Sequence, residues 1–493
     1  MRIQRCSGFI GFAGLLLLVG VTEARGQAPP DADALLPAGD EPDAAARGLR
    51  SLYIPDGLTA ERAVEEILRT SPDVQRTRAL SLEAKGGAVQ AMSGLVPRLE
   101  LVGRATKLSP VKTAGIPGGD SAVINARIDD LQDEAAQDLW RGLFSFQFPS
   151  LTTQYATDAT LIYSFTDSLA EALPAYRAAK KNKKAAQQQL EAELNDVAFG
   201  ARQAYYEFAR AKAGVGVAES AVAAAEAQRK DTAALVNAGA AARVDLLRVA
   251  AQLEAANVAL ERAKLGFQVA QRALQTLMHT NEVPTLGEDL SEPVTGIPSK
   301  TEDELKERAL VDRPDLQALY TYVEATRHQL KSANGGRAPD LLVRGSAQYS
   351  NPNLRVVPQQ ERFEGTWEVS AVIRWAPNDT VAAQGRSKQL QAALQRAEAD
   401  VIALGDAIRV EVAEGYHGVR AANAALKSAG LGLAAAEEGY RVKREQLRAG
   451  IVNTTDLLQS QSELIRAQVD VVDSAVGLRI AKAQLLRAIG SRP

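Results

Sequence analysis

Stretches with a helical spacing of apolar residues alternate, along each half of the chain, with short stretches in which apolar and polar residues alternate one by one. The longest helical stretch runs from Leu169 to about Asn237. It has no proline after Pro174 and is dense in alanine, glutamine, glutamate, lysine and arginine. At about 1.5 Å per residue such a helix would be roughly 100 Å long. No compact domain has a core that long, so it must pack along equally long partners.

Three further segments have the length and composition to be these partners. They are Val244–Met278, Thr380–Leu447 and Thr455–Ile489. Their many alanines favour helix and permit close approach between helices. Each half of the chain is therefore predicted to contain a long helix, a tight turn and a second long helix.

A shorter helix is predicted before the strands of each half. In the first half it begins near Thr59 and runs towards Pro97, with an interruption near Pro72. In the second half Thr301 and Glu304 have the spacing of a capping box, in which the two residues satisfy each other's backbone donors. The two halves thus begin in the same way.

Four β-strands are predicted from alternating patterns. Two begin at Leu99 and Leu341, and two return at about 157–166 and 364–376. The last strand alternates most clearly: one face carries Trp367, Val369, Ala371, Ile373 and Trp375, and the other carries Thr366, Glu368, Ser370 and Arg374.

The tryptophans of this strand indicate its surroundings. Trp367 and Trp375 are separated by roughly 26 Å at about 3.3 Å per residue, close to the ~25 Å apolar band of an outer-membrane barrel with an aromatic girdle at each rim. The alternative is an ordinary half-buried strand with two core tryptophans. Four strands are too few to close a barrel, and open edges cannot lie in hydrocarbon. If the strands are in a membrane, several chains must pool them.

The chain also repeats itself. A shift of 242 places Pro72, Pro97 and Pro110 on Pro314, Pro339 and Pro352. A shift of 211 runs without gaps from Tyr205 to Leu274; it places Tyr205 on Tyr416, Ala238-Gly239 on Ala449-Gly450, and Asp245-Leu246-Leu247 on Asp456-Leu457-Leu458. The protein is predicted to be two copies of one unit. The predicted divisions are a signal peptide 1–26, a disordered leader 27–51, a first repeat 52–279, a linker 280–300 and a second repeat 301–490.

The N-terminus is typical of a secretory signal peptide. Arg2 and Arg5 precede an apolar run, and small residues around Arg25 suit cleavage after Gly26. A retained anchor is the alternative, although about 13 apolar residues are too few to span a bilayer. The only cysteine, Cys6, precedes the apolar run, so the mature chain would have no thiol, disulfide or cysteine metal site.

Charge gives no support to nucleic-acid binding. The full chain has a formal net charge of −3, which becomes about −5 once the three arginines and one glutamate of residues 1–26 are removed. No segment after the signal peptide approaches the ~20 continuous apolar residues of a transmembrane helix.

Paired motifs connect the chain to a known family. They are Ser71-Pro72-Asp73 and Arg313-Pro314-Asp315, with the two turn segments 237–246 and 448–457. With these motifs the chain resembles the TolC-like outer-membrane efflux proteins over about residues 52–490. The family's turn has Val-Gly followed five or six residues later by Asp-Val or Asp-Leu; here alanine replaces the valine in both turns.

The resemblance implies a fold that is mainly α with a membrane β-barrel. Two tandem repeats, each of helix, strand, strand and long helical hairpin, would assemble as a homotrimer with a twelve-stranded β-barrel and a periplasmic α-helical barrel. The implied location is the cell outer membrane with a periplasmic extension. The implied partners are outer-membrane lipid, a periplasmic adaptor protein and an inner-membrane pump, with no cofactor and no nucleic acid.

The resemblance also implies roles for the two turns at the periplasmic tip. Asp245 and Asp456 would constrict the channel, and the adaptor-docking residues would be Ala238, Gly239, Ala240, Ala449, Gly450 and Ile451. The alternative is purely structural, because glycine suits the left-handed end of a helix and aspartate suits the positive start of the next. Departures from the family's gating residues fall at Leu447, Val452 and Gln459, so the tip would close through other contacts or would close less tightly.

Enzyme signals are absent from the sequence. His279, His328 and His417 have no paired metal-ligand spacing, and there is no phosphate-binding loop or nucleophile elbow. The basic cluster 180–184 suggests either an anion or lipid contact or, more simply, a solvated helix face near the membrane end.

The first repeat carries a surplus at residues 111–150. A short helix is expected over 120–143, ending near Trp140, and the resemblance places it at the cell surface, with a receptor or gating role or none. The function that the sequence predicts is a passive exit duct for small molecules. The alternatives are a duct for type I protein secretion and a periplasmic coiled-coil scaffold with no pore.

Overall fold

The computed structural model describes residues 54–109, 121–144, 152–296, 299–357 and 359–491. The predicted signal peptide and leader lie outside these residues. The first repeat contains α2 (Ala60–Thr70), α3 (Pro72–Ser93), β1 (Arg98–Lys107), α4 (Ser121–Asp129), α5 (Glu134–Phe144), β2 (Thr153–Ser164), α6 (Phe165–Asp167), the π-helix η2 (Ser168–Ala172), α7 (Leu173–Asn237) and α8 (Arg243–Met278). The second repeat contains α9 (Glu302–Asp312), α10 (Pro314–Gly335), β3 (Asp340–Asn351), β4 (Glu364–Arg374), α11 (Pro377–Arg448) and α12 (Thr454–Ala488).

The short helices begin where the sequence predicts. Ser71 accepts a hydrogen bond from the Val74 amide and starts α3 immediately before Pro72, which has no amide hydrogen to satisfy. Thr301 and Glu304 form the predicted capping box, with the Thr301 amide donating to Glu304 Oε2 over 2.9 Å. The interrupted first helix and the capped second one are both confirmed.

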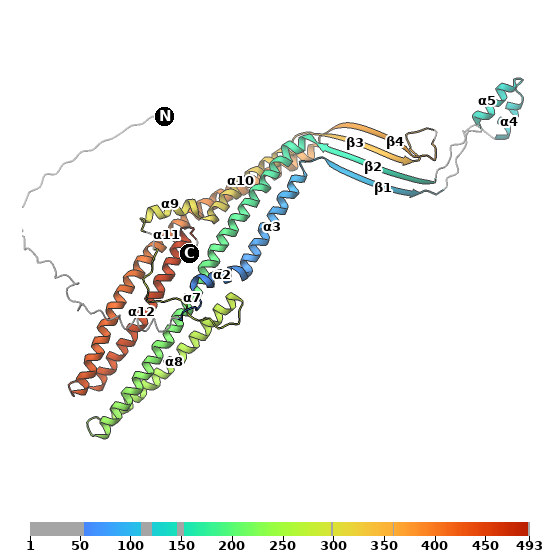
Figure 1. Ribbon diagram of the computed structural model, residues 1–493. Helices are drawn as coiled ribbons and strands as arrows, with labels where there is room; N and C mark the ends of the chain where they lie inside the picture. The colour runs from blue at the N-terminus through green and yellow to red at the C-terminus, as the bar shows by residue number, and fades with distance from the viewer. Residues whose placement is uncertain (1–53, 110–120, 145–151, 297–298, 358, 492–493) are drawn as a thin grey trace, which may run out of the picture. The chain divides into compact units, whose positions relative to one another are not determined.

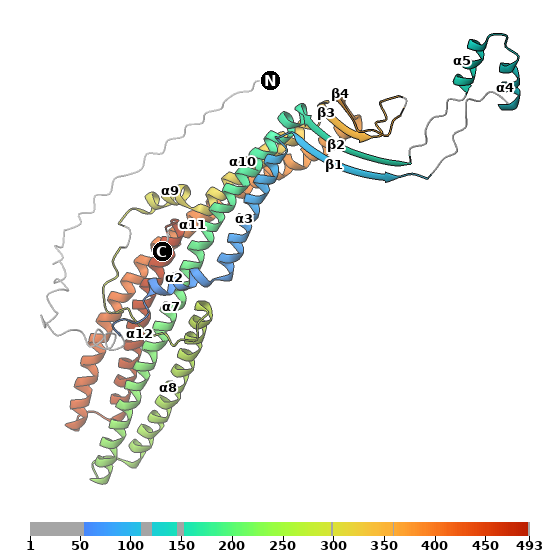
Figure 2. The ribbon, with the colours of Figure 1, turned by 45° about the vertical axis from the view of Figure 1, so that its right-hand side comes forward.

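The long helices form two antiparallel hairpins. Figures 1 and 2 show α7 beside α8 and α11 beside α12, and α12 also packs on α7. Arg487 pairs with Asp196 over 2.6 Å, and Arg210 pairs with Asp473 over 3.3 Å. The two pairs are equally spaced along α7 and α12, so these helices run antiparallel in constant register. The turns at the ends of the two hairpins therefore lie at the same end of the helical region.

Alanine makes the close packing of these helices possible. The first core cluster places Ala198, Ala201, Ala209 and Ala213 of α7 around the fully buried Tyr205 and Phe208, and it extends to Val472 and Val476 of α12. A second cluster joins α9, α10, α11 and α12 around Leu305, Leu316, Ile408 and Leu485. The core is thus a set of narrow seams along the helices.

The four strands form one antiparallel sheet in the order β1-β2-β3-β4. The register pairs Leu101 with Ala159, Ala159 with Ala347, and Ala347 with Trp367. Odd-numbered residues of all four strands therefore share one face, and even-numbered residues share the other. The outer edges of β1 and β4 have no strand partner among the described residues.

Several predicted boundaries were wrong, and β2 begins at Thr153 and not at about residue 157. β2 ends at Ser164 because the Ser164 hydroxyl caps the next turn, accepting from the Asp167 amide, so the last two residues of the predicted strand are helical. β4 ends at Arg374, which leaves Trp375 just beyond the strand. The helix expected over 120–143 is two helices, α4 and α5, because Asp133 starts a new helix by accepting from the Ala135 amide.

None of the helices in the described part of the chain combines the length and the apolar character needed to cross a membrane. The described residues also contain no cluster of histidine, cysteine and acidic side chains arranged to hold a metal ion.

Candidate functional site: the sheet faces, the hairpin turns and the linker network

The two faces of the sheet differ in chemistry. The odd-numbered face exposes large apolar side chains: Leu99, Leu101, Leu161, Tyr349, Trp367, Val369 and Ile373. Trp367 and Ile373 are exposed by 76% and 75%. An apolar patch of this extent on a folded chain indicates contact with lipid or with another protein. A role for Trp367 and Trp375 as core residues is excluded, since Trp375 is also 59% exposed.

Aromatic side chains gather at both ends of this apolar face. At one end Phe363 stacks on Tyr349 with ring centroids 5.2 Å apart, and Tyr155 lies 6.4 Å from Phe363. At the other end Tyr163 and Phe165 make an edge-to-face pair at 4.7 Å. The aromatic residues bracket an aliphatic band, which is the arrangement expected where a surface passes between two interfaces.

The even-numbered face is mainly charged and polar, although Val102 and Val372 are also exposed there. Arg104 pairs with Asp158 over 3.1 Å, and Arg355 pairs with Glu368. The side chains of Glu100, Arg344 and Gln348 line the same shallow hollow, which has a volume of about 410 Å³. Such a face suits contact with water and not with hydrocarbon.

The hairpin turns have nearly identical backbones. Gly239 and Gly450 have φ values of +76° and +72°, in the left-handed region that costs glycine little. One residue later, the Ala240 amide donates to Leu235 O over 2.8 Å, and the Ile451 amide donates to Gln446 O over 2.9 Å. These bonds are Schellman motifs, which end α7 and α11 by satisfying their last carbonyls.

The aspartates after each turn cap the returning helix. Asp245 accepts from the Ala242 amide over 3.3 Å, and Asp456 accepts from the Asn453 amide over 3.4 Å. In the second turn Asn453 reciprocates by accepting from the Asp456 amide over 3.0 Å. Both aspartates therefore have the structural role that the sequence allowed, at the start of the returning helix.

The residues predicted to dock an adaptor are all on the surface: Ala238, Gly239, Ala240, Ala449, Gly450 and Ile451. Ile451 is 72% exposed, and the space around both glycines is open. At the positions that depart from the family's gating residues, Leu447 accepts the Gly450 amide through its carbonyl, and Gln459 donates to Glu463 over 3.1 Å.

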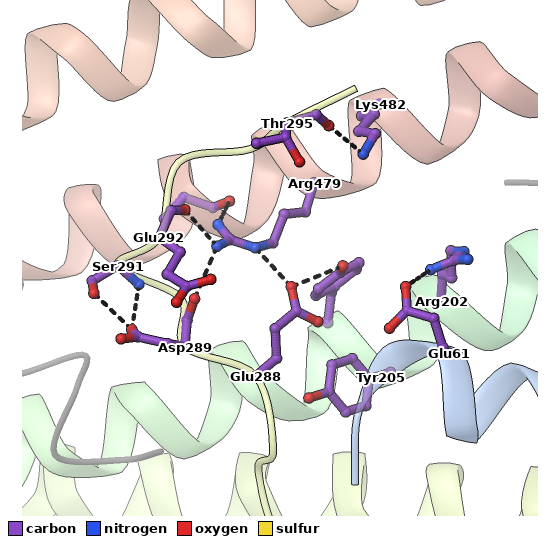
Figure 3. A network of polar contacts seen from close by, with 12 residues as sticks. Glu61, Arg202, Tyr205, Glu288, Asp289, Ser291, Glu292, Thr295, Arg479 and Lys482 are labelled. Carbon is purple, nitrogen blue, oxygen red and sulfur yellow. Dashed lines mark hydrogen bonds and ion pairs between the residues drawn. The ribbon is translucent and has the colours of Figure 1, made fainter. Parts of the chain in front are cut away.

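Sequence reasoning missed a buried polar network around the linker (Figure 3). At its centre is Arg479 of α12, whose side chain is only 6% exposed. Its guanidinium donates to Glu288 Oε1 over 3.1 Å and to the carbonyl oxygens of Asp289 and Glu292. A buried arginine that satisfies this many groups holds the linker against the second repeat.

The same network reaches the first repeat. Tyr206 of α7 donates to Glu288 over 3.2 Å, and Tyr205 donates to the Leu58 carbonyl over 2.8 Å. Burial raises the pKa of both phenols well above their usual value, and the Glu288 carboxylate adds to the effect. Both tyrosines therefore remain neutral donors at any physiological pH. No pattern of neighbouring residues in the sequence reports this network, because its members come from distant segments.

Beside this network the start of the first repeat pairs with the linker. Leu58 and Leu286 form a parallel bridge, and Gly57 and Gly287 cross so closely that a Cβ on Gly287 would lie 2.3 Å from Gly57. Only two glycines fit at this crossing.

A second buried arginine anchors the start of α10. Arg313 donates to both carboxylate oxygens of Asp315, over 3.1 and 2.6 Å, and to Glu411 of α11. Burial alone would raise the pKa of Asp315, but the hydrogen bonds and charge of Arg313 hold it below its ordinary value. The signature Arg313-Pro314-Asp315 is thus a packed ion-pair site.

Comparison with known proteins finds matches to part of the sequence. Residues 305–491 match the sequence model of the family described as outer membrane efflux protein. The curated relative BepC, an outer membrane efflux protein of Brucella suis biovar 1 (strain 1330), is 25% identical over 185 residues, which are 37% of this chain and 39% of BepC. The sequence match therefore spans about two-fifths of that relative.

Likeness to solved structures extends over most of the chain. The outer-membrane channel OprN matches with a TM-score of 0.71 at 17% identity, over 90% of this chain and 95% of OprN. The Campylobacter jejuni CmeC outer membrane channel matches with a TM-score of 0.71 at 16% identity, over 88% of this chain and 86% of CmeC. The predicted TolC-like fold of a single chain is confirmed, and the match over residues 305–491 supports the predicted resemblance to outer-membrane efflux proteins.

Proposed function

We propose that the protein is the passive exit duct of a tripartite efflux system, through which small molecules delivered by an inner-membrane pump leave the cell. The observation that carries the proposal is the four-stranded sheet with one apolar and one charged face. Three chains would pool their sheets, pairing the free edges of β1 and β4, into a twelve-stranded barrel with lipid outside and water inside. The Trp367 and Trp375 side chains would form part of its girdles.

In this assembly the hairpin turns would be the entrance. The exposed residues around Gly239 and Gly450 would dock a periplasmic adaptor. Three copies of Asp245 and of Asp456 would gather at the constriction, where each carboxylate could attract cations while it still caps its helix. The name of the relative BepC as an efflux protein supports export as the direction of transport. Nothing in the geometry supplies energy, which would come from the pump.

The test is reconstitution into planar bilayers, with ion conductance as the measurement. The wild type should insert and conduct. Replacing Val369 and Ile373 by arginine should cost about 2–4 kcal/mol for each charge at mid-membrane depth and abolish insertion. The matched control is Ser346→Arg, on the opposite face beside Glu368, which should insert normally.

The alternative is a periplasmic scaffold without a pore. It predicts no conductance from the wild type and equal tolerance of arginine on both faces. Insertion of the wild type together with selective failure of the apolar-face variants would exclude it.

A further inference from the structure

Helices α7 and α10 share a face on which basic residues outnumber acidic residues. The two helices are antiparallel, and their register is marked by Gln188, which donates to Gln317 over 3.2 Å, and by Lys181, which pairs with Glu324 farther towards the sheet. Residues three or four positions apart on each helix therefore lie on the same side of the α7–α10 pair.

Basic side chains dominate that side, which we name the basic face. It comprises Arg177, Lys180, Lys181 and Lys184 of α7 and Arg327, His328 and Lys331 of α10. The acidic residues near it are Glu324 of α10 and Glu398 of α11. Glu398 pairs with Arg327 over 2.7 Å. Arg177, Lys180, Lys184 and Lys331 are all exposed. The basic face therefore has an excess of positive charge available to a ligand.

The positive charges of this surface affect the His328 imidazole. Burial lowers the pKa of its imidazole, and the positive charges of Lys331, Arg177 and Lys181 lower it further. Its Nδ1 atom is buried and has no hydrogen-bond partner within the described residues. The lysines and arginines act on one another across the two helices, and an anion would relieve their repulsion.

The position of the basic face suggests its ligand. The helix that begins at Phe165 continues β2 directly, and Phe165 and Leu169 expose apolar side chains by 46% and 66%. Arg177 follows about 12 Å beyond Leu169 at ~1.5 Å per residue. Side chains of a helix lean towards its N-terminus, and in α7 that direction is towards the sheet. The chain thus passes from the apolar band of the sheet, through the aromatic residues at its end, to the basic side chains of α7.

We infer that the basic face binds the anionic headgroups of phospholipids in the membrane leaflet next to the helical region. The inference rests on the proposed function, because it requires the sheet to lie in the membrane. Long basic side chains place their stems along apolar surface and their charges among headgroups. Each lysine or arginine near an anionic surface contributes about fivefold to its association.

The experiment reconstitutes the full-length protein in vesicles of equimolar phosphatidylglycerol and phosphatidylcholine and measures the ratio of the two lipids that remain bound after extraction. The test variant carries Lys180→Gln, Lys181→Gln and Lys184→Gln. The matched control carries Lys230→Gln, Lys427→Gln and Lys443→Gln, which remove the same charge far from the sheet. Vesicle flotation and the thermal midpoint in detergent report insertion and folding separately.

The wild type and the control should retain several-fold more phosphatidylglycerol than phosphatidylcholine, and the test variant should lose at least tenfold of the association with phosphatidylglycerol. The preference should also shrink as salt rises, because the contacts are exposed. The inference alone would be overturned by a wild type that inserts without any lipid preference. It would also be overturned by a control that loses as much association with phosphatidylglycerol as the test variant. A wild type that fails to float with vesicles would overturn the proposed function and this inference together.

Discussion

Helices α8 and α12 occupy the same place in the two repeats but lie in different surroundings. The shift of 211 that aligns the repeats places Leu265 on Val476 and Gln268 on Arg479. Leu265 is 61% exposed, whereas Val476 is completely buried. Gln268 is exposed, whereas Arg479 is the centre of the linker network.

The difference follows from what packs on each helix. α12 lies between α11 and α7 and also carries the linker, while α8 contacts α7 and α2. The repeated pattern therefore determines that both segments are helices, and the neighbours determine which side chains are buried. In the proposed trimer the uncovered apolar residues of α8 would be available to an adjacent chain.

The largest expected effect comes from Arg479→Met. It should lower the free energy of unfolding by about 3 kcal/mol, because the partly buried Glu288 carboxylate and two linker carbonyls would lose the guanidinium that they share. Gln268→Met, the equivalent change in α8, should stay within about 0.5 kcal/mol. Denaturant unfolding in detergent measures both. Equal effects would mean that the linker network is not what separates the two helices.

Val476→Ala should cost about 2 kcal/mol, since it removes two buried methyl groups and leaves a cavity. Leu265→Ala should leave the stability of the protomer nearly unchanged but weaken assembly. Unfolding and light scattering distinguish the two outcomes. A large loss of protomer stability in Leu265→Ala would show that α8 is covered within the chain.

The turns allow a smaller comparison. Asn453→Ala should cost about 1 kcal/mol because it removes the side chain that caps α12. Ala242→Asn should stabilise α8 by a similar amount, since Ala242 has no side chain that can accept the Asp245 amide. Thermal unfolding should therefore shift in opposite directions. Shifts of the same sign would contradict the capping geometry.

Acid should weaken the ion pair between Arg313 and Asp315 in the second repeat's signature. The pKa of Asp315 is lowered in the folded protein, so its stabilising effect is present above the ordinary carboxyl pKa and is lost as pH falls through the lowered value. Asp315→Asn should flatten stability against pH below about 4. The matched change Asp73→Asn, at an exposed side chain paired with Arg76, should leave that dependence intact. A pH profile that is the same in both variants would refute this assignment.

Local signals in the sequence predicted most of the helices and strands. Thr301 with Glu304, the glycines of the turns and the alternation around Val369 each depend on neighbours within a few residues. The break between α4 and α5 was missed although Asp133 is a local signal for it, because aspartate is a good N-cap and a poor residue for a helix interior.

The linker network could not be predicted in this way. Arg479, Glu288 and Tyr206 are brought together only when distant helices pack, and each looks like an ordinary surface residue in sequence. The same holds for Arg313, whose partner Glu411 lies on another helix. The sequence allowed both a structural and a channel role for Asp245 and Asp456, and the capping bonds establish only the first.

The bridge between Leu58 and Leu286 sets an order of events during synthesis. The first residues of the first repeat cannot reach their partner until the linker has been synthesised. A contact between segments so far apart forms late and slows folding. In the proposed location the start of the chain would wait unpaired during export, so the periplasm would first hold a nearly complete repeat with an open end, a state that chaperones could recognise.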